Sequence, residues 1–271
     1  MVEISEITVF YPDLPDYLDG LTILHVSDMH TRRFGPREQR LHEVMQQGCD
    51  LLLCTGDTCF QFSLTPFENK HGEALSGWSL SRRGLILAAE TDKALAVWRK
   101  LLNDFPCRLG VYMVQGNHDS PEFMTRVQTL GVNVLNNQSR LVHLKGPDGP
   151  KINICGLKCM GRQTADIPHT LAAIDPDYFS IGLCHYPEMS EPLTAGGCQL
   201  VLAGHTHGGQ ICLPSGRPLI THSQTGLKYL AGLQSTGPGY VHTSRGLGKT
   251  FIPLRTYCPP EIARLTLRNK I

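Results

Sequence analysis

The chain has 271 residues, enough for one large domain or two small ones and for a sizeable core. Its 25 Lys and Arg and 24 Asp and Glu give a formal charge of +1, so nonspecific binding to nucleic acid is not expected. A hydrophobic content of 41% with 18% charged residues is typical of a globular chain and excludes a disordered one. We therefore expect a single domain over residues 1–271.

The first part of the chain alternates short apolar runs with helical patterns. Residues 21–27 and 50–55 are typical of buried strands, and residues 36–47 are expected to form a helix that begins at Pro36. Apolar residues recur at helical spacing over 87–105, and residues 110–115 are expected to form a third strand. This order of elements predicts that the fold begins with a β-α-β unit. Further strands are expected at 141–144, 151–157, 179–184, 199–203, 240–244 and 261–267.

The N-terminus lacks the pattern of a secretion signal. It carries Glu3 and Glu6 where a signal peptide is basic, and no apolar run approaches the roughly 18 residues that span a bilayer. These features predict a cytoplasmic protein without a transmembrane segment, and they leave peripheral contact with a membrane open. The ten cysteines include no C-x-x-C pair, so we expect reduced core thiols.

Polar side chains follow five of the predicted strands at the point where each strand ends. In open α/β sheets, ligands bind at the carboxyl ends of strands. Taken singly, each of these residues is more often a hydrogen-bonded core or surface group, but five such fragments in order favour a metal site. The residues are Asp28 and His30, Asp57, the run Asn117, His118 and Asp119, His185, and the pair His205 and His207.

Two of these fragments, Asp28-x-His30 and His205-x-His207, place ligand-type residues two positions apart. In extended backbone, residues i and i+2 point to the same face, so each pair is predicted to share a cation. Glycines next to three of the fragments are expected to let the chain turn sharply without blocking the site. They are Gly56, Gly116 and Gly204.

Together these motifs resemble the signature of the calcineurin-like metallophosphoesterases, in matching order over residues 28–207. The extension of the last motif to Gly-His-Thr-His-Gly-Gly-Gln, the segment 244–248 and the ending at 260–262 are similar to a bacterial phosphodiesterase branch of that superfamily. The resemblance implies an α/β fold, a four-layer α/β/β/α sandwich of two mixed sheets. The expected strands are numerous enough to supply it.

The resemblance also implies a centre of two divalent metal ions bridged by Asp57. Carboxylate, amide and imidazole ligands suit Mn²⁺, with Fe or Zn²⁺ as alternatives. Two cations about 3.5 to 4 Å apart can activate a water and clamp the phosphoryl oxygens for in-line attack. The first ion is expected on Asp28, His30, Asp57 and His207, and the second on Asp57, Asn117, His185 and His205.

Two neighbouring residues are expected to act on the leaving group. In the family that the chain resembles, the histidine at position 118 lies over the scissile phosphate, so His118 is expected to protonate the leaving oxygen. Asp119 is expected to orient that ring and favour its imidazolium form, or to cap a helix that begins near Ser120. Both roles of Asp119 can hold together.

The segment 59–83 departs from the family pattern because a β-α-β link does not need it. It begins two residues after Asp57 and carries large aromatic residues that a solvated loop does not require. We expect an insert at about 59–83 that acts as a lid or specificity element, with a surface ornament as the alternative. The aromatic residues are Phe60, Phe62, Phe67 and Trp78.

Two classes of function remain open on this resemblance. A phosphoesterase that cleaves a phosphodiester or pyrophosphate bond is favoured, because an inactive binding module on the same fold tends to lack ligands and none is missing here. A lipid-linked substrate, such as the UDP-2,3-diacylglucosamine cleaved in lipid A synthesis by related enzymes, is an alternative because the aromatic insert could receive acyl chains. The expected partner is a phosphate ester.

Other histidines match no motif and are expected to pack in the core or on the surface. Arg245 and Arg255 could neutralise a substrate phosphate, but isolated arginines are mostly solvated or ion-paired, which is the role expected here. The histidines are His25, His42, His143, His169, His222 and His242.

Overall fold

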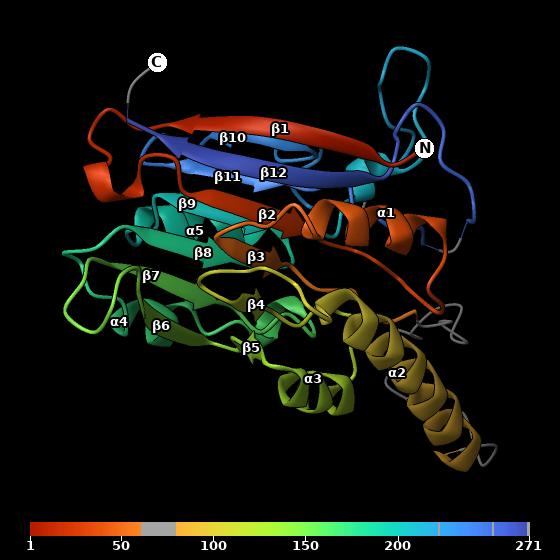
Figure 1. The fold of residues 1–271 in the computed structure, drawn as a ribbon. Helices are drawn as coiled ribbons and strands as arrows, with labels where there is room; N and C mark the ends of the chain where they lie inside the picture. Colours follow the sequence, from red (N-terminus) through yellow and green to blue (C-terminus); the bar gives the residue numbers. More distant parts are fainter. Residues whose placement is uncertain (61–79, 222, 251, 270–271) are drawn as a thin grey trace.

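The computed structural model describes residues 1–60, 80–221, 223–250 and 252–269. Within these residues it holds two six-stranded sheets (Figure 1). The first has the strand order β1 (Glu3–Phe10), β12 (Glu261–Arg268), β2 (Thr22–Val26), β3 (Leu51–Cys54), β4 (Val111–Met113) and β5 (Val132–Val134). The second has the order β10 (Gly232–Ser235), β11 (Tyr240–Thr243), β9 (Leu200–Ala203), β8 (Ser180–Leu183), β7 (Lys151–Gly156) and β6 (Gln138–His143).

Both sheets are mixed. In the first, β2 to β5 are parallel and β12 runs antiparallel to β2, with Leu265 opposite Ile23. In the second, β7, β8, β9 and β11 are parallel, and β6 and β10 are antiparallel edge strands. The parallel strands place several carboxyl ends side by side, which is the arrangement that gathers loop residues into one site.

Helices cover the outer face of each sheet. α1 (Pro36–Met45), α2 (Leu80–Leu102) and α3 (Pro121–Val127) share a hydrophobic cluster with the first sheet. α4 (Ile167–Ala172) and α5 (Ser190–Ala195) contact the second. Single 3-10 turns lie at η1 (Asp16–Leu18), η2 (Gln128–Leu130), η3 (Arg162–Thr164), η4 (Pro187–Met189) and η5 (His207–Gly209). The predicted four-layer α/β/β/α sandwich of two mixed sheets is confirmed.

The central strands are apolar throughout because both of their faces are buried. In β2, Ile23 points into the cluster between the two sheets, whereas Leu24 points into the cluster under the helices. The same alternation places Leu51 between the sheets and Leu52 under the helices. Strands buried on both sides need continuous apolar runs, which is why these runs predicted them.

Helix starts and ends differ in how closely the sequence predicts them. α1 begins at Pro36 as expected, and the Glu38 carboxylate accepts a hydrogen bond from the backbone N–H of Gly35 at 3.0 Å. The long helix α2 begins at Leu80, so the predicted start at residue 87 is wrong, and residues 80–83 of the predicted insert are helical. Of the predicted insert, residues 61–79 lie outside the described residues.

Three strands have no counterpart in the sequence prediction. β1 is an edge strand that pairs only with β12, and much of it is exposed, so it has no apolar run. β5 has three residues and β10 contains glycine, glutamine and serine, which are too short or too polar for the pattern. Among the described residues, no helix has the length and apolar content needed to cross a bilayer.

Candidate metal centre

The seven predicted ligands lie together at the ends of five strands. Each ligand sits in the loop directly after a strand, two to four residues past its last residue. Asp28 and His30 follow β2, Asp57 follows β3, Asn117 follows β4, His185 follows β8, and His205 and His207 follow β9. Six of them form two clusters in which all offered ligand atoms lie within 4.8 Å of one another.

The first cluster consists of Asp28, His30 and His207, all buried. His207 Nε2 lies 3.3 Å from Asp28 Oδ1, and His30 Nε2 lies 3.2 Å from His207 Nε2. Two imidazole nitrogens and a carboxylate oxygen thus face one point.

The second cluster consists of Asp57, His185 and His205. His185 Nε2 lies 3.2 Å from Asp57 Oδ2 and 3.2 Å from His205 Nδ1. Asn117 joins this cluster, since its Oδ1 lies 2.9 Å from His185 Nε2. The donor set is again imidazole nitrogen with hard oxygens, which suits a divalent transition metal.

Asp57 lies between the two clusters. Its Oδ2 is 3.2 Å from His185 Nε2 and 3.8 Å from His30 Nε2, so one oxygen faces ligands of both groups. Its Oδ1 accepts a hydrogen bond from the backbone N–H of His118 at 2.8 Å, which fixes the carboxylate plane. This placement is the one that a bridging ligand between two cations requires.

The backbone at the ligands is not extended, so the predicted reason for their pairing is wrong. Five ligand residues have positive φ: 49° at Asp28, 40° at His30, 53° at Asp57, 71° at His205 and 53° at His207. Left-handed backbone, and not strand alternation, brings Asp28 and His30 together, and likewise His205 and His207. Such backbone costs a non-glycine residue about 1–3 kcal/mol and clusters at functional sites.

The glycines beside the ligands serve two different purposes. Gly56 has a φ of 91° and makes the predicted sharp turn. Gly116 and Gly204 are needed instead for close approach. A Cβ on Gly116 would lie 2.2 Å from Asp57 Oδ1, and one on Gly204 would lie 2.0 Å from Ser27 Oγ. Any side chain at these two positions would displace a ligand residue or its direct support.

The electrostatics of the clusters fit divalent cations. Burial by itself raises the pKa of Asp28 and of Asp57, but the surrounding histidines outweigh it and hold both pKa values below the usual range. Burial lowers the pKa of His30 and of His205 to about 3. Burial also acts to lower the pKa of His185, but Asp57 outweighs it and raises that pKa to about 9. The site therefore offers anionic carboxylates and neutral imidazoles at His30 and His205, and the His185 proton is the one that a cation would displace.

Contacts behind the ligands fix their orientation. The Nδ1 of His185 lies 2.8 Å from the carbonyl oxygen of Thr55, and the Nδ1 of His30 lies 3.3 Å from that of Cys59. These contacts leave both Nε2 atoms facing the clusters, as such outer partners do in metalloproteins. Sequence reasoning missed these partners because a backbone carbonyl carries no residue signal.

Comparison with known proteins decides the family. Residues 21–209 match the family described as calcineurin-like phosphoesterase. The chain belongs to this family. It is a metallophosphoesterase whose described part holds two buried His/Asp clusters suited to metal ions.

Two curated relatives and one solved structure are similar to this phosphoesterase. The uncharacterized metallophosphoesterase YkuE of Bacillus subtilis is 30% identical over 277 residues, which cover 99% of this chain and 86% of YkuE. The phosphodiesterase YaeI of Escherichia coli is 29% identical over 257 residues, which cover 90% of this chain and 81% of YaeI. NAD nucleotidase of Haemophilus influenzae matches in fold with a TM-score of 0.50 and 15% identity, over 84% of this chain and 50% of that one.

Asp119 has different partners from those predicted. Its Oδ1 accepts hydrogen bonds from the backbone N–H groups of Thr58 and Cys59, and its Oδ2 accepts those of Asp57 and Gly116, all within 2.8–3.0 Å. A carboxylate has about four lone-pair sites, so this set uses them all and leaves none to orient His118. The helix cap is Ser120, whose Oγ accepts the Phe123 N–H at 3.0 Å. Asp119 instead holds the loop that carries Asp57.

His118 is half-buried and lines the cavity beside the clusters. Its ring lies edge-on to that of His30, with centroids 5.1 Å apart. Because its backbone N–H fixes Asp57, its ring is held next to the first cluster without belonging to either. Its role as a proton donor to a phosphate ester stays a prediction.

Arg255 is a residue of this site that sequence reasoning treated as solvated or ion-paired. Its guanidinium is largely buried, and its Nη2 lies 3.1 Å from His207 Nδ1. It also donates to five backbone carbonyls at 2.6–3.3 Å. It thus ties the ligand His207 to the loop after β11. The carbonyls belong to His207, Arg245, Gly246, Gly248 and Cys258.

We expect Arg255→Lys to weaken the affinity for one of two bound cations by about 10–100-fold, the usual cost of losing an outer support of a ligand. A lysine offers one point of donation and cannot replace the planar fork of donors. Competition with a fluorescent chelator measures the affinity. Arg264→Lys is the matched control, because Arg264 also donates to backbone but on β12, against Val44. Equal affinities in both variants would contradict a role for Arg255 in holding His207.

Proposed function

We propose that this metallophosphoesterase hydrolyses a phosphodiester bond with two divalent cations, and that Mn²⁺ is the preferred metal for both. The observation that carries the proposal is the position of Asp57 Oδ2 between the two ligand clusters. We assign the first cation to Asp28, His30, Asp57 and His207, and the second to Asp57, Asn117, His185 and His205. When bound, such a pair supplies Lewis acidity to the phosphoryl group and lowers the pKa of a water placed for in-line attack.

The chain's own residues supply the remaining steps. His118 lies beside the first cluster and lines the cavity, so its ring protonates the oxygen of the departing group. Asp119 positions the bridging ligand through its four backbone hydrogen bonds and does not touch the substrate. No side chain needs to form a covalent phosphoenzyme, because water is the nucleophile.

Two observations favour a diesterase over the alternatives. The relative YaeI bears the name phosphodiesterase, and that activity is proposed here for this chain. All seven ligands are present and face common points, which disfavours an inactive binding module. The alternative of a lipid-linked UDP-sugar substrate depends on aromatic residues of which only Phe60 lies in the described part of the chain. The cytoplasmic location stays a prediction.

The test is turnover by protein that is stripped of metal and refilled with Mn²⁺, Zn²⁺, Fe²⁺ or Mg²⁺. We expect two equivalents of metal per chain and hydrolysis of bis-p-nitrophenyl phosphate at least about tenfold faster than of p-nitrophenyl phosphate. Metal content is measured by elemental analysis of the same samples. Two bound equivalents without turnover of any ester would establish a binding module instead, and faster cleavage of the monoester would overturn the diesterase assignment.

A further inference from the structure

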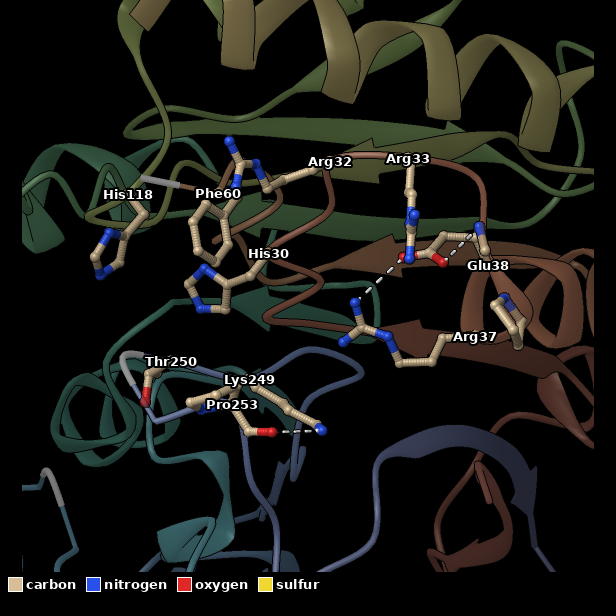
Figure 2. Close-up of a pocket in the computed structure, with 12 residues that line it drawn as sticks. His30, Arg32, Arg33, Arg37, Glu38, Phe60, His118, Lys249, Thr250 and Pro253 are labelled. Carbon is tan, nitrogen blue, oxygen red and sulfur yellow. Dashed lines mark hydrogen bonds and ion pairs between the residues drawn. The ribbon is translucent and has the colours of Figure 1, made fainter. Parts of the chain in front are cut away.

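A cavity of about 630 Å³ opens beside the clusters, and its far wall is basic. His30 and His118 lie toward one end of it (Figure 2). The rest of its lining comes mainly from the segment after β2, with Arg32, Arg33 and residues 35–38, and from Lys249, Thr250 and Pro253, after β11. The volume is within the range of small-molecule sites and exceeds what one phosphate fills.

Four cationic side chains line this cavity against one carboxylate. The cations are Arg32, Arg33, Arg37 and Lys249, and the carboxylate belongs to Glu38. A chain with a formal charge of only +1 has no general excess of basic residues, so this concentration is local.

The carboxylates near the cavity do not cancel this charge. Glu38 is buried and accepts hydrogen bonds from the Thr31 hydroxyl at 2.9 Å and the Gly35 N–H at 3.0 Å. Its Oε1 lies 3.6 Å from Arg37 Nη2. A single carboxylate therefore faces one of the cations and holds the loop in shape with its remaining contacts.

Arg32 forms a fixed wall of the cavity. It makes a two-point ion pair with Glu90, at 2.9 and 3.0 Å, and its guanidinium lies over the Phe60 ring, 4.9 Å from the centroid. Both contacts hold the side chain in one place. The charge that Arg32 brings is matched by Glu90, so the excess comes from the others.

The excess charge rests on Arg33 and Lys249. Lys249 Nζ donates a hydrogen bond to the carbonyl oxygen of Pro253 at 2.9 Å (Figure 2). This acceptor is neutral, so it leaves the charge of Lys249 in place. Within the described residues, no side chain or backbone group pairs with the guanidinium of Arg33, which is exposed. Two cations on opposite loops thus face the cavity with their charge uncompensated.

One scissile phosphodiester does not account for these cations. It carries one negative charge, and the two metal ions of the proposed centre already exceed it. Cations placed beyond the metal site fit a second anion on the same molecule. Arginine in particular matches the oxygens of a phosphoryl group through parallel hydrogen bonds.

We propose that this cavity is a subsite for a second phosphoryl group, so that the preferred substrates carry a phosphate or diphosphate next to the scissile diester. The proposal rests on the proposed function, since the scissile phosphate must sit at the clusters. It deepens that function by naming the substrate class. Arg33 and Lys249 are the residues that bind the second phosphoryl group.

The test uses three p-nitrophenyl diesters with the same leaving group. They differ in the second ester group on the phosphate. In the first diester this group is 3-hydroxypropyl, in the second it is 3-hydroxypropyl phosphorylated on its hydroxyl, and in the third it is a chain of the same length that ends in a carboxylate. We expect kcat/KM for the phosphorylated diester to exceed that for the hydroxyl form by at least about tenfold, and the preference to shrink at high salt. The double variant Arg33→Gln, Lys249→Gln should reduce the preference to less than about twofold.

The control removes the same charge elsewhere. Arg140→Gln with Lys145→Gln changes two exposed cations at and beside β6, away from the cavity lining, and should keep the full preference. Equal kcat/KM for the hydroxyl and phosphorylated diesters, or a preference that survives in the double variant, would overturn the subsite. An equal preference for the carboxylate would show a general anion site and overturn the assignment to phosphoryl groups.

Binding measurements separate this proposal from the proposed function. Calorimetry with the metal-loaded protein compares propane-1,3-diphosphonate with propylphosphonate, neither of which is hydrolysed. At least about tenfold tighter binding of the diphosphonate, lost in the double variant, would support the subsite even if no diester is turned over. Equal binding of the two ligands would refute the subsite even in a protein that is an active diesterase.

Discussion

Asp57→Asn is expected to remove at least one of the two cations and to lower turnover by about 10³-fold or more. The substitution keeps the shape of the side chain but replaces an anionic oxygen that faces both clusters, 3.2 Å from His185 Nε2 and 3.8 Å from His30 Nε2. Losing charge stabilisation of a transition state at one position typically costs about 10²–10³ in rate, and the lost cation adds to that. Elemental analysis and kinetics on one sample measure both effects.

Two comparisons make this result specific. Asp148→Asn removes an equal charge at an exposed turn and should keep two equivalents of metal and full turnover. Thermal unfolding of metal-free Asp57→Asn distinguishes loss of the ligand from loss of the fold. Two retained equivalents with normal turnover would remove Asp57 from the bridging position.

The residues that gather at the candidate metal centre could be predicted from sequence because each belongs to a local motif at the end of an apolar strand. The fold could be predicted for a related reason, since β2 and β3 are buried on both faces and need continuous apolar runs. The β1 strand could not, because as an edge strand it leaves much of its surface exposed and its pairing with β12 joins opposite ends of the chain.

The supports of the ligands could not be predicted, because they depend on backbone geometry and distant contacts. His205 has a φ of 71°, and because residues other than glycine rarely adopt this left-handed backbone, its residue type does not predict it. Asp119 acts through the backbone of residues 57–59, and Arg255 reaches His207 from a loop 48 positions away. Motifs therefore identify which side chains meet, while the tertiary structure decides what holds them.

The sequence predicted that the cysteines are reduced thiols packed in the core. Cys54, Cys155 and Cys184 pack in hydrophobic clusters with fully buried side chains, as expected of small apolar residues. Burial raises the pKa of Cys54 to about 12, so that thiol is a poor metal ligand near pH 7. Among the described residues, the two clusters contain histidine and carboxylate side chains with the amide of Asn117, and no cysteine.

His118→Asn should leave both cations bound and slow turnover by about 10²–10⁴-fold, the usual contribution of a positioned proton donor. The backbone N–H of residue 118 holds Asp57 Oδ1 at 2.8 Å and is kept in the variant, so the bridge is undisturbed. The loss should grow as the leaving group becomes more basic, because nitrophenolate departs without a proton and an alkoxide does not. Kinetics on a series of aryl and alkyl diesters, with metal content measured alongside, test this dependence. If the alkyl and nitrophenyl diesters lost rate equally, the His118 ring would be stabilising the phosphoryl oxygens instead of protonating the leaving oxygen.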